Sequence, residues 1–159
     1  MDLLSSQGGF TTADVLLRLG LASVLGLVLG LDREVRGMAA GIRTHAMVSL
    51  SAAVITVSAL MLYNEMRAAG NSDLDPLRVI QGLAQAIGFI AAGVIFVSKG
   101  GVHNLTSAAN IWLATAIGIA AGAGQFTLAL ISVGLGLFIL IVVRFVEFLI
   151  PGSGKAQDD

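Results

Sequence analysis

The stretch GLDREVRGMAAGIRTH, residues 30–45, is a charged interruption in a strongly apolar chain. It holds five of the nineteen charged residues of the protein, namely Asp32, Arg33, Glu34, Arg36 and Arg43. On either side lie apolar runs of about 16 to 20 residues, which are long enough to cross a bilayer core of roughly 30 Å. We therefore interpret this stretch as the connection between the first two helices of a membrane protein.

Further apolar runs recur along the 159 residues, and the mean hydropathy of +0.91 lies far above that of soluble domains. We predict an all-α, polytopic transmembrane helical bundle with five spans in one domain, residues 13–150. The predicted spans cover about residues 13–31, 44–63, 78–97, 105–123 and 126–150. Residues 1–12 are expected to form a short extracytoplasmic N-terminus, and residues 151–159 a cytoplasmic tail. The start MDLLSSQGGFTTAD lacks the basic region of a cleaved signal peptide, so we expect the first span to be retained.

Basic residues in the short connections predict the orientation of the bundle, because Lys and Arg accumulate on the cytoplasmic side. Six of the nine fall on the side of the charged stretch: Arg33, Arg36, Arg43, Lys99, Arg144 and Lys155. The other three are Arg18, Arg67 and Arg78. This distribution predicts an N-terminus outside the cell and a C-terminus in the cytoplasm.

Several classes of function are excluded by composition and motifs. The net charge of −1 argues against nucleic acid as a partner, and the absence of cysteine excludes thiol chemistry. The chain has no GxxxxGK[ST], GxSxG or HExxH motif, so we expect no enzymatic activity and no cofactor. We also expect no metal site. Only two histidines are present, and every acidic residue lies near a span end, whereas magnesium prefers carboxylate and other oxygen ligands.

Glycines and small polar residues recur at helical spacing within the spans. Gly26 with Gly30 and Gly118 with Gly122 form GxxxG pairs, which allow helices to approach closely in lipid. They indicate packing within the bundle, with a homodimer contact or a pore lining as alternatives. Three polar faces are also expected to meet: His45/Ser49/Ala52/Thr56, Gln81/Gln85/Gly88/Ala92 and Ser107/Asn110/Ala114/Gly118. They predict either hydrogen bonds between helices or an intramembrane polar site at Gln81, Gln85 and Asn110 for an ion or small ligand.

Two interpretations of the charged stretch remain open. Its arginines would orient the protein and bind anionic lipid headgroups, and Asp32 with Arg36 forms a helix-spaced ion pair. Orientation does not require the two acids, however. The alternative is a functional polar loop, made of Asp32, Arg33, Glu34, Arg36, Arg43 and His45, that docks a partner or closes the mouth of the bundle. We expect the alternating charges of this loop to contact His103 and Asn104, or a partner protein.

Three stretches resemble the MgtC/SapB family of bacterial inner-membrane proteins. They are GLDREVRGMAAGIRTHAMVSL at the charged connection, RVIQGLAQAIGFIAAGVIF (residues 78–96) and VHNLTSAANIWLATAIGIAAGAG (residues 102–124). Larger members carry a soluble domain after the last span. This chain ends nine residues after Ile150, so it resembles a short, SapB-like form.

The resemblance implies a multi-pass protein of the bacterial inner membrane. Its implied role is to modulate other membrane protein complexes, including the ATP synthase. This role would belong to magnesium limitation or to stress and virulence adaptation. The alternative is a small ion or metabolite transporter, which with five short helices would be a homo-oligomer.

Overall fold

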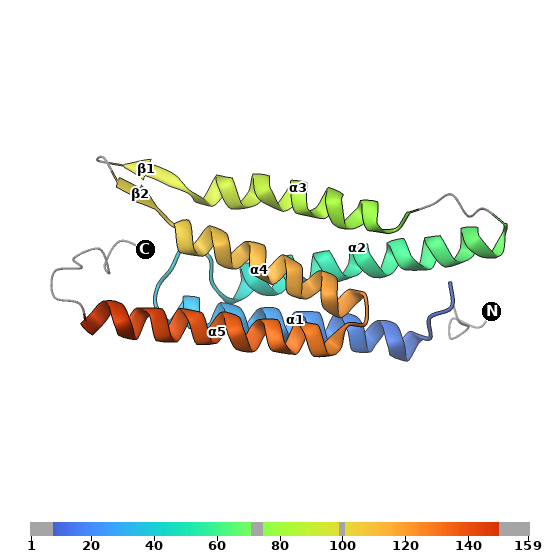
Figure 1. Cartoon of the computed structure of the whole chain (residues 1–159), viewed down its shortest axis with the longest axis horizontal. Coiled ribbons are helices and arrows are strands. Elements are labelled where there is room, and N and C mark those ends of the chain that lie inside the picture. The colour runs from blue at the N-terminus through green and yellow to red at the C-terminus, as the bar shows by residue number, and fades with distance from the viewer. Residues whose placement is uncertain (1–7, 71–74, 99–100, 150–159) are drawn as a thin grey trace.

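The computed structural model describes residues 8–70, 75–98 and 101–149, which form five helices and one short hairpin (Figure 1). The elements are α1 (Thr12–Val35), α2 (Ile42–Ala68), α3 (Leu77–Val94), β1 (Phe96–Ser98), β2 (Gly101–His103), α4 (Leu105–Gly122) and α5 (Phe126–Leu149). All five helices are long and apolar enough to cross a membrane. The predicted all-α, five-span architecture is confirmed, whereas the expected tail at residues 151–159 lies outside the described residues.

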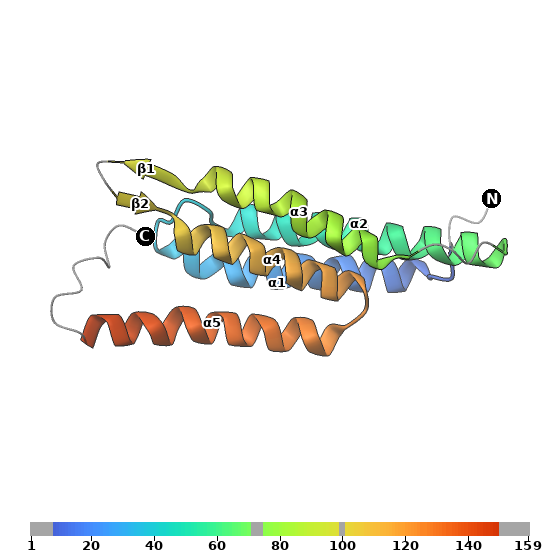
Figure 2. The same cartoon turned by 45° about the horizontal axis from the view of Figure 1, so that its top comes forward.

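Helix α4 lies at the centre of the bundle and packs against the four other helices. Helices α1 and α2 form the layer beside it, and α3 and α5 flank it on opposite sides (Figure 2). An apolar core of mostly small side chains joins α1, α2, α4 and α5. A smaller cluster of Ala40, Ile87 and Ile111 joins α3 to α4.

Helix α1 extends further than hydropathy predicts, because the charged residues continue its last turn. It begins with a capping box in which the Thr11 hydroxyl accepts from the Asp14 amide, 3.2 Å away, and Asp14 accepts from the Thr11 amide. It ends at Val35, four residues beyond the predicted end. Gly37, with φ of 68°, then takes the left-handed conformation that commonly terminates a helix.

Helix α3 ends at Val94, earlier than the predicted residue 97, because the chain turns into a hairpin. β1 and β2 pair antiparallel, and the rings of Phe96 and His103 stack with centroids 4.9 Å apart. The Asn104 amide donates to the Val94 carbonyl over 3.1 Å and joins the end of α3 to the start of α4. Extended β-branched and aromatic residues favour this hairpin, but within an apolar run they resemble a continued span.

Glycines bring the backbones of α4 and α2 into direct contact. A Cβ atom at Gly118 would lie 2.2 Å from the Ser49 carbonyl oxygen, and one at Gly122 would lie 2.8 Å from the Ala53 carbonyl oxygen. Neither position can accept a side chain without moving α2. The second predicted GxxxG pair therefore lies where two helices of one chain touch.

The first GxxxG pair packs α1 against α2. A Cβ atom at Gly26 would lie 2.7 Å from the His45 carbonyl oxygen, and one at Gly30 would lie 2.7 Å from the Ile42 Cα atom. Helix α2 thus approaches both α1 and α4 closely through its backbone, and α1 and α4 also contact each other. The three helices form a rigid unit that positions the polar residues at one end.

Candidate functional site: a polar cluster at the hairpin end

Most of the predicted polar residues gather at one end of the bundle. At this end α1 and α3 finish, α2 and α4 begin, and the β1–β2 hairpin connects α3 to α4 (Figure 1). We call it the hairpin end. Helices α2 and α4 run in the same direction from it, so the polar faces near their N-termini lie at the same level.

Arg33 is the most deeply buried charged residue that the structure describes. Only 3% of it is exposed, and its guanidinium donates to the hydroxyl of Ser107, which is fully buried in the first turn of α4, over 2.7 Å. This contact joins the end of α1 to the start of α4. Burial of a guanidinium requires such partners, because desolvation of an unpaired charge is costly.

Arg33 meets the start of α4 close to the residues expected to contact the charged loop. Ser107 lies three residues beyond Asn104, whose side chain donates to the end of α3. His103 stacks on Phe96 of the hairpin. Arg33 follows Gly26 and Gly30 at helical spacing and so continues the buried face of α1. This spacing in the sequence is the feature from which burial of Arg33 could have been predicted.

Asp32 and Arg36 form the predicted ion pair at the rim of the cluster. One carboxylate oxygen accepts from both Nε and Nη2 of Arg36, and the side chains are 16% and 18% exposed respectively. The other carboxylate oxygen is buried and has no hydrogen-bond partner among the described residues. The pair therefore retains one open acceptor.

Glu34 caps the next helix, which explains an acid that orientation alone does not require. Its carboxylate accepts from the Ile42 amide, 3.0 Å away, at a helix start whose N-cap residue is Gly41 and supplies no side chain. A Cβ atom at Gly41 would lie 1.8 Å from the same carboxylate oxygen. Glycine at this position thus makes room for the cap, while Arg43 lies exposed beyond it.

His45 and Asn110 carry buried polar atoms that lack hydrogen-bond partners within the described part of the chain. His45 is fully buried, and its Nδ1 lies 2.9 Å from the Gly41 carbonyl oxygen, so Nδ1 carries a proton and donates to this carbonyl. Both Nε2 of His45 and Nδ2 of Asn110 are unpartnered. Asn110 is 4% exposed. The first two turns of α2 and α4 thus each carry one buried polar atom that is open to a water molecule or polar ligand.

Gln81 and Gln85 do not join this cluster. Both are exposed on the outer side of α3, and the helix packs through Ile87 and Ala91 instead. The prediction that this face meets the polar faces of α2 and α4 is wrong. Helical spacing identifies the residues that share a face but not the neighbour that the face meets.

The buried hydroxyl groups serve the backbone. Ser49 donates to the Ala22 carbonyl over 2.8 Å, and Thr56 and Thr115 each donate to the carbonyl four residues earlier. In the described ranges, no group of three or more His, Asp or Glu residues is close enough to bind a metal ion together. The arrangement provides hydrogen-bonding groups and charges, held in place by helix packing.

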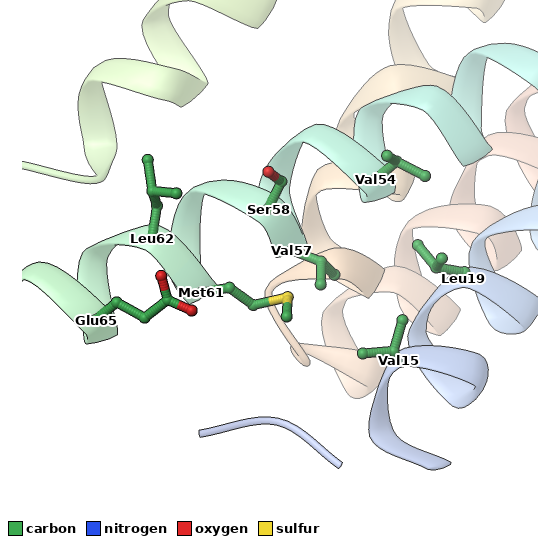
Figure 3. A pocket seen from close by; sticks show the side chains of 8 residues that line it. All are labelled: Val15, Leu19, Val54, Val57, Ser58, Met61, Leu62 and Glu65. Atoms are coloured by element: carbon green, nitrogen blue, oxygen red, sulfur yellow. The ribbon is translucent and has the colours of Figure 1, made fainter. Parts of the chain in front are cut away.

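A separate open pocket of about 310 Å³ lies between α1 and α2, away from the hairpin end (Figure 3). Its lining is mostly apolar and consists of Val15, Leu19, Val54, Val57, Ser58, Met61, Leu62 and Glu65. Figure 3 shows Val15 and Leu19 on α1 facing the side of α2 that carries the other six residues. The pocket contains none of the candidate polar residues.

The distribution of basic residues predicts that the hairpin end is cytoplasmic, and cysteine labelling tests this. Ala39 and Ala69 are exposed at opposite ends of α2, and the native chain has no cysteine. In intact cells, a membrane-impermeant maleimide should label Ala69→Cys at once and Ala39→Cys only after permeabilisation. The reverse pattern would show that the orientation is inverted.

Comparison with known proteins identifies relatives over most of the chain. A profile of the MgtC family matches residues 19–149. Protein SapB of Bacillus subtilis is 35% identical over 142 residues, which are 89% of this chain and 60% of that protein. The "Putative magnesium transporter YhiD" of Escherichia coli K12 is 31% identical over 137 residues, covering 86% of this chain and 64% of that protein.

Protein MgtC of Brucella abortus is 32% identical over 140 residues, which cover 86% of this chain and 56% of the relative. The chain thus spans about 60% of the length of these relatives. Protein SapB also extends beyond the region that matches this chain. The length of this chain is therefore not an argument for the expected likeness to a short, SapB-like form. No solved structure matches the chain.

Proposed function

Because this multi-pass membrane protein belongs to the MgtC family, we propose that it is a non-enzymatic modulator of other membrane proteins in the bacterial cytoplasmic membrane. Its action would be needed when magnesium is scarce or the cell is under stress. The observation that carries the proposal is the hairpin end, where charged side chains are fixed in position by contacts among α1, α2 and α4. A partner protein requires such a preformed polar surface.

The surface has the composition of a docking site for a partner at the membrane boundary. Glu34 and Arg43 are exposed there, and the ion pair of Asp32 and Arg36 is partly exposed beside them. Arg33 fixes this turn to α4 through Ser107. A partner with alternating charges could therefore bind with little rearrangement.

Close helix packing supports a modulator over an ion carrier acting as a single chain. The backbones of α1 and α4 contact α2 at Gly26, Gly30, Gly118 and Gly122. These contacts fill the centre of the three-helix unit with protein atoms. An ion crossing this unit would have to separate packed backbones.

The second candidate function is transport of magnesium or another small solute by an oligomer. Two observations favour it. One relative carries the name "Putative magnesium transporter YhiD". The unpartnered polar atoms of His45 and Asn110 are also buried in helices able to span the membrane, where a transported solute would require polar contacts.

A magnesium flux assay and a growth assay distinguish the two functions. Purified protein in liposomes should give no magnesium uptake above that of empty liposomes. In a deletion strain at low magnesium, Arg43→Ala should restore growth less well than the wild type, because Arg43 is exposed on the docking surface. Arg67→Ala is the matched control, since Arg67 is exposed at the opposite end of α2, and it should restore growth fully.

Membrane levels of each variant must equal those of the wild type for the comparison to hold. Magnesium flux through the purified protein would contradict the modulator function and favour transport. Equal growth with both variants would show that the hairpin end is not the surface that acts.

A further inference from the structure

Two glutamines lie on the outer face of α3, next to exposed apolar residues such as Phe89 and Ile90. We define the α3 stripe as Gln81, Gln85, Gly88 and Ala92, which recur at spacings of four, three and four. Both glutamines and Ala92 are exposed, and a Cβ atom at Gly88 would meet no atom within 4 Å. The helix contacts the bundle through a different side, where Ile87 and Ala91 are buried.

This face does not suit contact with lipid. A glutamine side chain has two donor hydrogens and one acceptor oxygen, and the hydrocarbon core supplies no partner for them. Helix α5, on the opposite flank, differs: Leu135, Phe138 and Ile139 make its exposed face apolar. The two flanking spans are similarly little buried, 11% for α3 and 17% for α5, so the exposed glutamines are what distinguishes α3 from the lipid-suited α5.

We propose that a second copy of this chain covers the α3 stripe and forms a two-fold symmetric dimer in the membrane. Two copies have the same orientation in the bilayer, so their α3 helices run parallel and place equal residues at equal depth. A carboxamide both donates and accepts, and each glutamine can therefore pair with its counterpart in the second copy. The stripe is complementary to itself in hydrogen bonding.

Close approach of the two helices is possible next to the glutamines. Gly88 and Ala92 form a small-xxx-small pair one turn beyond Gln85, and such pairs let helix backbones approach in lipid. Packing of the small residues would hold the glutamine amides in contact. The polar and the small parts of the stripe thus favour the same neighbour.

Charges at the start of α3 are also compatible with a second copy. Asp75 and Arg78 are both exposed there, within one helical turn of each other. In a parallel pair, Arg78 of one copy can face Asp75 of the other, so opposite charges meet at the aqueous boundary. This interface does not depend on whether the protein modulates partners or transports a solute.

Cysteine crosslinking tests the proposal, because the chain has no cysteine of its own. Ala92→Cys places a thiol in the stripe. Ile90→Cys is the matched control, since Ile90 is 50% exposed at nearly the same depth but roughly half a turn away. Under mild oxidation in liposomes, Ala92→Cys should form at least several-fold more disulfide-linked dimer than Ile90→Cys. Equal crosslinking at both positions, or none at either, would overturn the proposal.

A second measurement addresses the glutamines. Replacement of Gln81 and Gln85 by leucine should raise the dimer dissociation constant by about ten-fold, because several interhelical hydrogen bonds are lost. Gln125→Leu, at an exposed glutamine between α4 and α5, is the control and should leave the constant unchanged. Both variants should unfold at the wild-type temperature.

Undiminished dimerisation of the leucine variant would overturn the proposal. Crosslinking of Ala92→Cys in native membranes to a different protein, without a homodimer, would also overturn it and would assign the stripe to that protein.

Discussion

Gly118→Ala is expected to destabilise the bundle by about 3 kcal/mol relative to a matched glycine substitution, because it forces α2 and α4 apart. The added Cβ atom would lie 2.2 Å from the Ser49 carbonyl oxygen and 2.9 Å from the Ala52 Cβ atom. The nearest atom belongs to a helical backbone, so it cannot rotate away as a flexible side chain could. Ser49 also donates to the Ala22 carbonyl, and displacement of α2 would therefore disturb α1.

Gly134→Ala is the matched control for this change. Gly134 lies in α5, and a Cβ atom there would meet nothing within 4 Å. Alanine is a better helix former than glycine by about 1 kcal/mol, so the control should be neutral or slightly more stable than the wild type. Unfolding in detergent, followed by circular dichroism, gives both values. Equal stability of the two variants would contradict the backbone contact between α2 and α4.

The second large effect is expected from loss of the buried hydrogen bond between Arg33 of α1 and Ser107 of α4. Arg33→Met and Ser107→Ala each remove one side of this bond. Arg33→Met removes the donor and leaves the buried hydroxyl of Ser107 without it, so we expect a loss of about 1 to 3 kcal/mol. Arg43→Met is the control, because Arg43 is exposed, and should change stability by no more than about 0.5 kcal/mol.

A double-mutant cycle isolates the interaction itself. The combined variant Arg33→Met with Ser107→Ala should be less destabilised than the sum of the single changes, with a coupling of about 1.5 to 3 kcal/mol for a hydrogen bond to a charged group. Unfolding free energies of the four proteins give this value. A coupling near zero would show that the contact contributes nothing specific to the bundle.

The sequence predicts the number of helices well because apolar length and bilayer thickness are directly related. The ends of the helices are less predictable from hydropathy. Asp32 and Glu34 remain helical in the structure because a helix satisfies its own backbone whatever its side chains carry. At the end of α3, Phe96 belongs to a strand although its apolar neighbours read as a continued span.

The residues of the candidate site are likewise only partly predictable from the sequence. Helical spacing correctly groups His45 with Ser49, and Ser107 with Asn110, since both faces are buried. The same spacing groups Gln81 with its neighbours, but the face turns outward because α3 packs through other residues. Adjacent charges near a span end look alike in sequence. Only the neighbouring helices determine that Arg33 is buried.

The hydrogen bond between Arg33 and Ser107 also constrains the order in which the protein can be assembled. Its two residues are separated by 74 positions, whereas Glu34 caps the next helix only eight residues later. During synthesis, α1 and α2 can therefore pair as soon as both have left the ribosome. Arg33 acquires its α4 partner only after α3 and the hairpin have been made. The contact between α1 and α4 at this end of the bundle therefore forms only once α4 enters the membrane and completes the core.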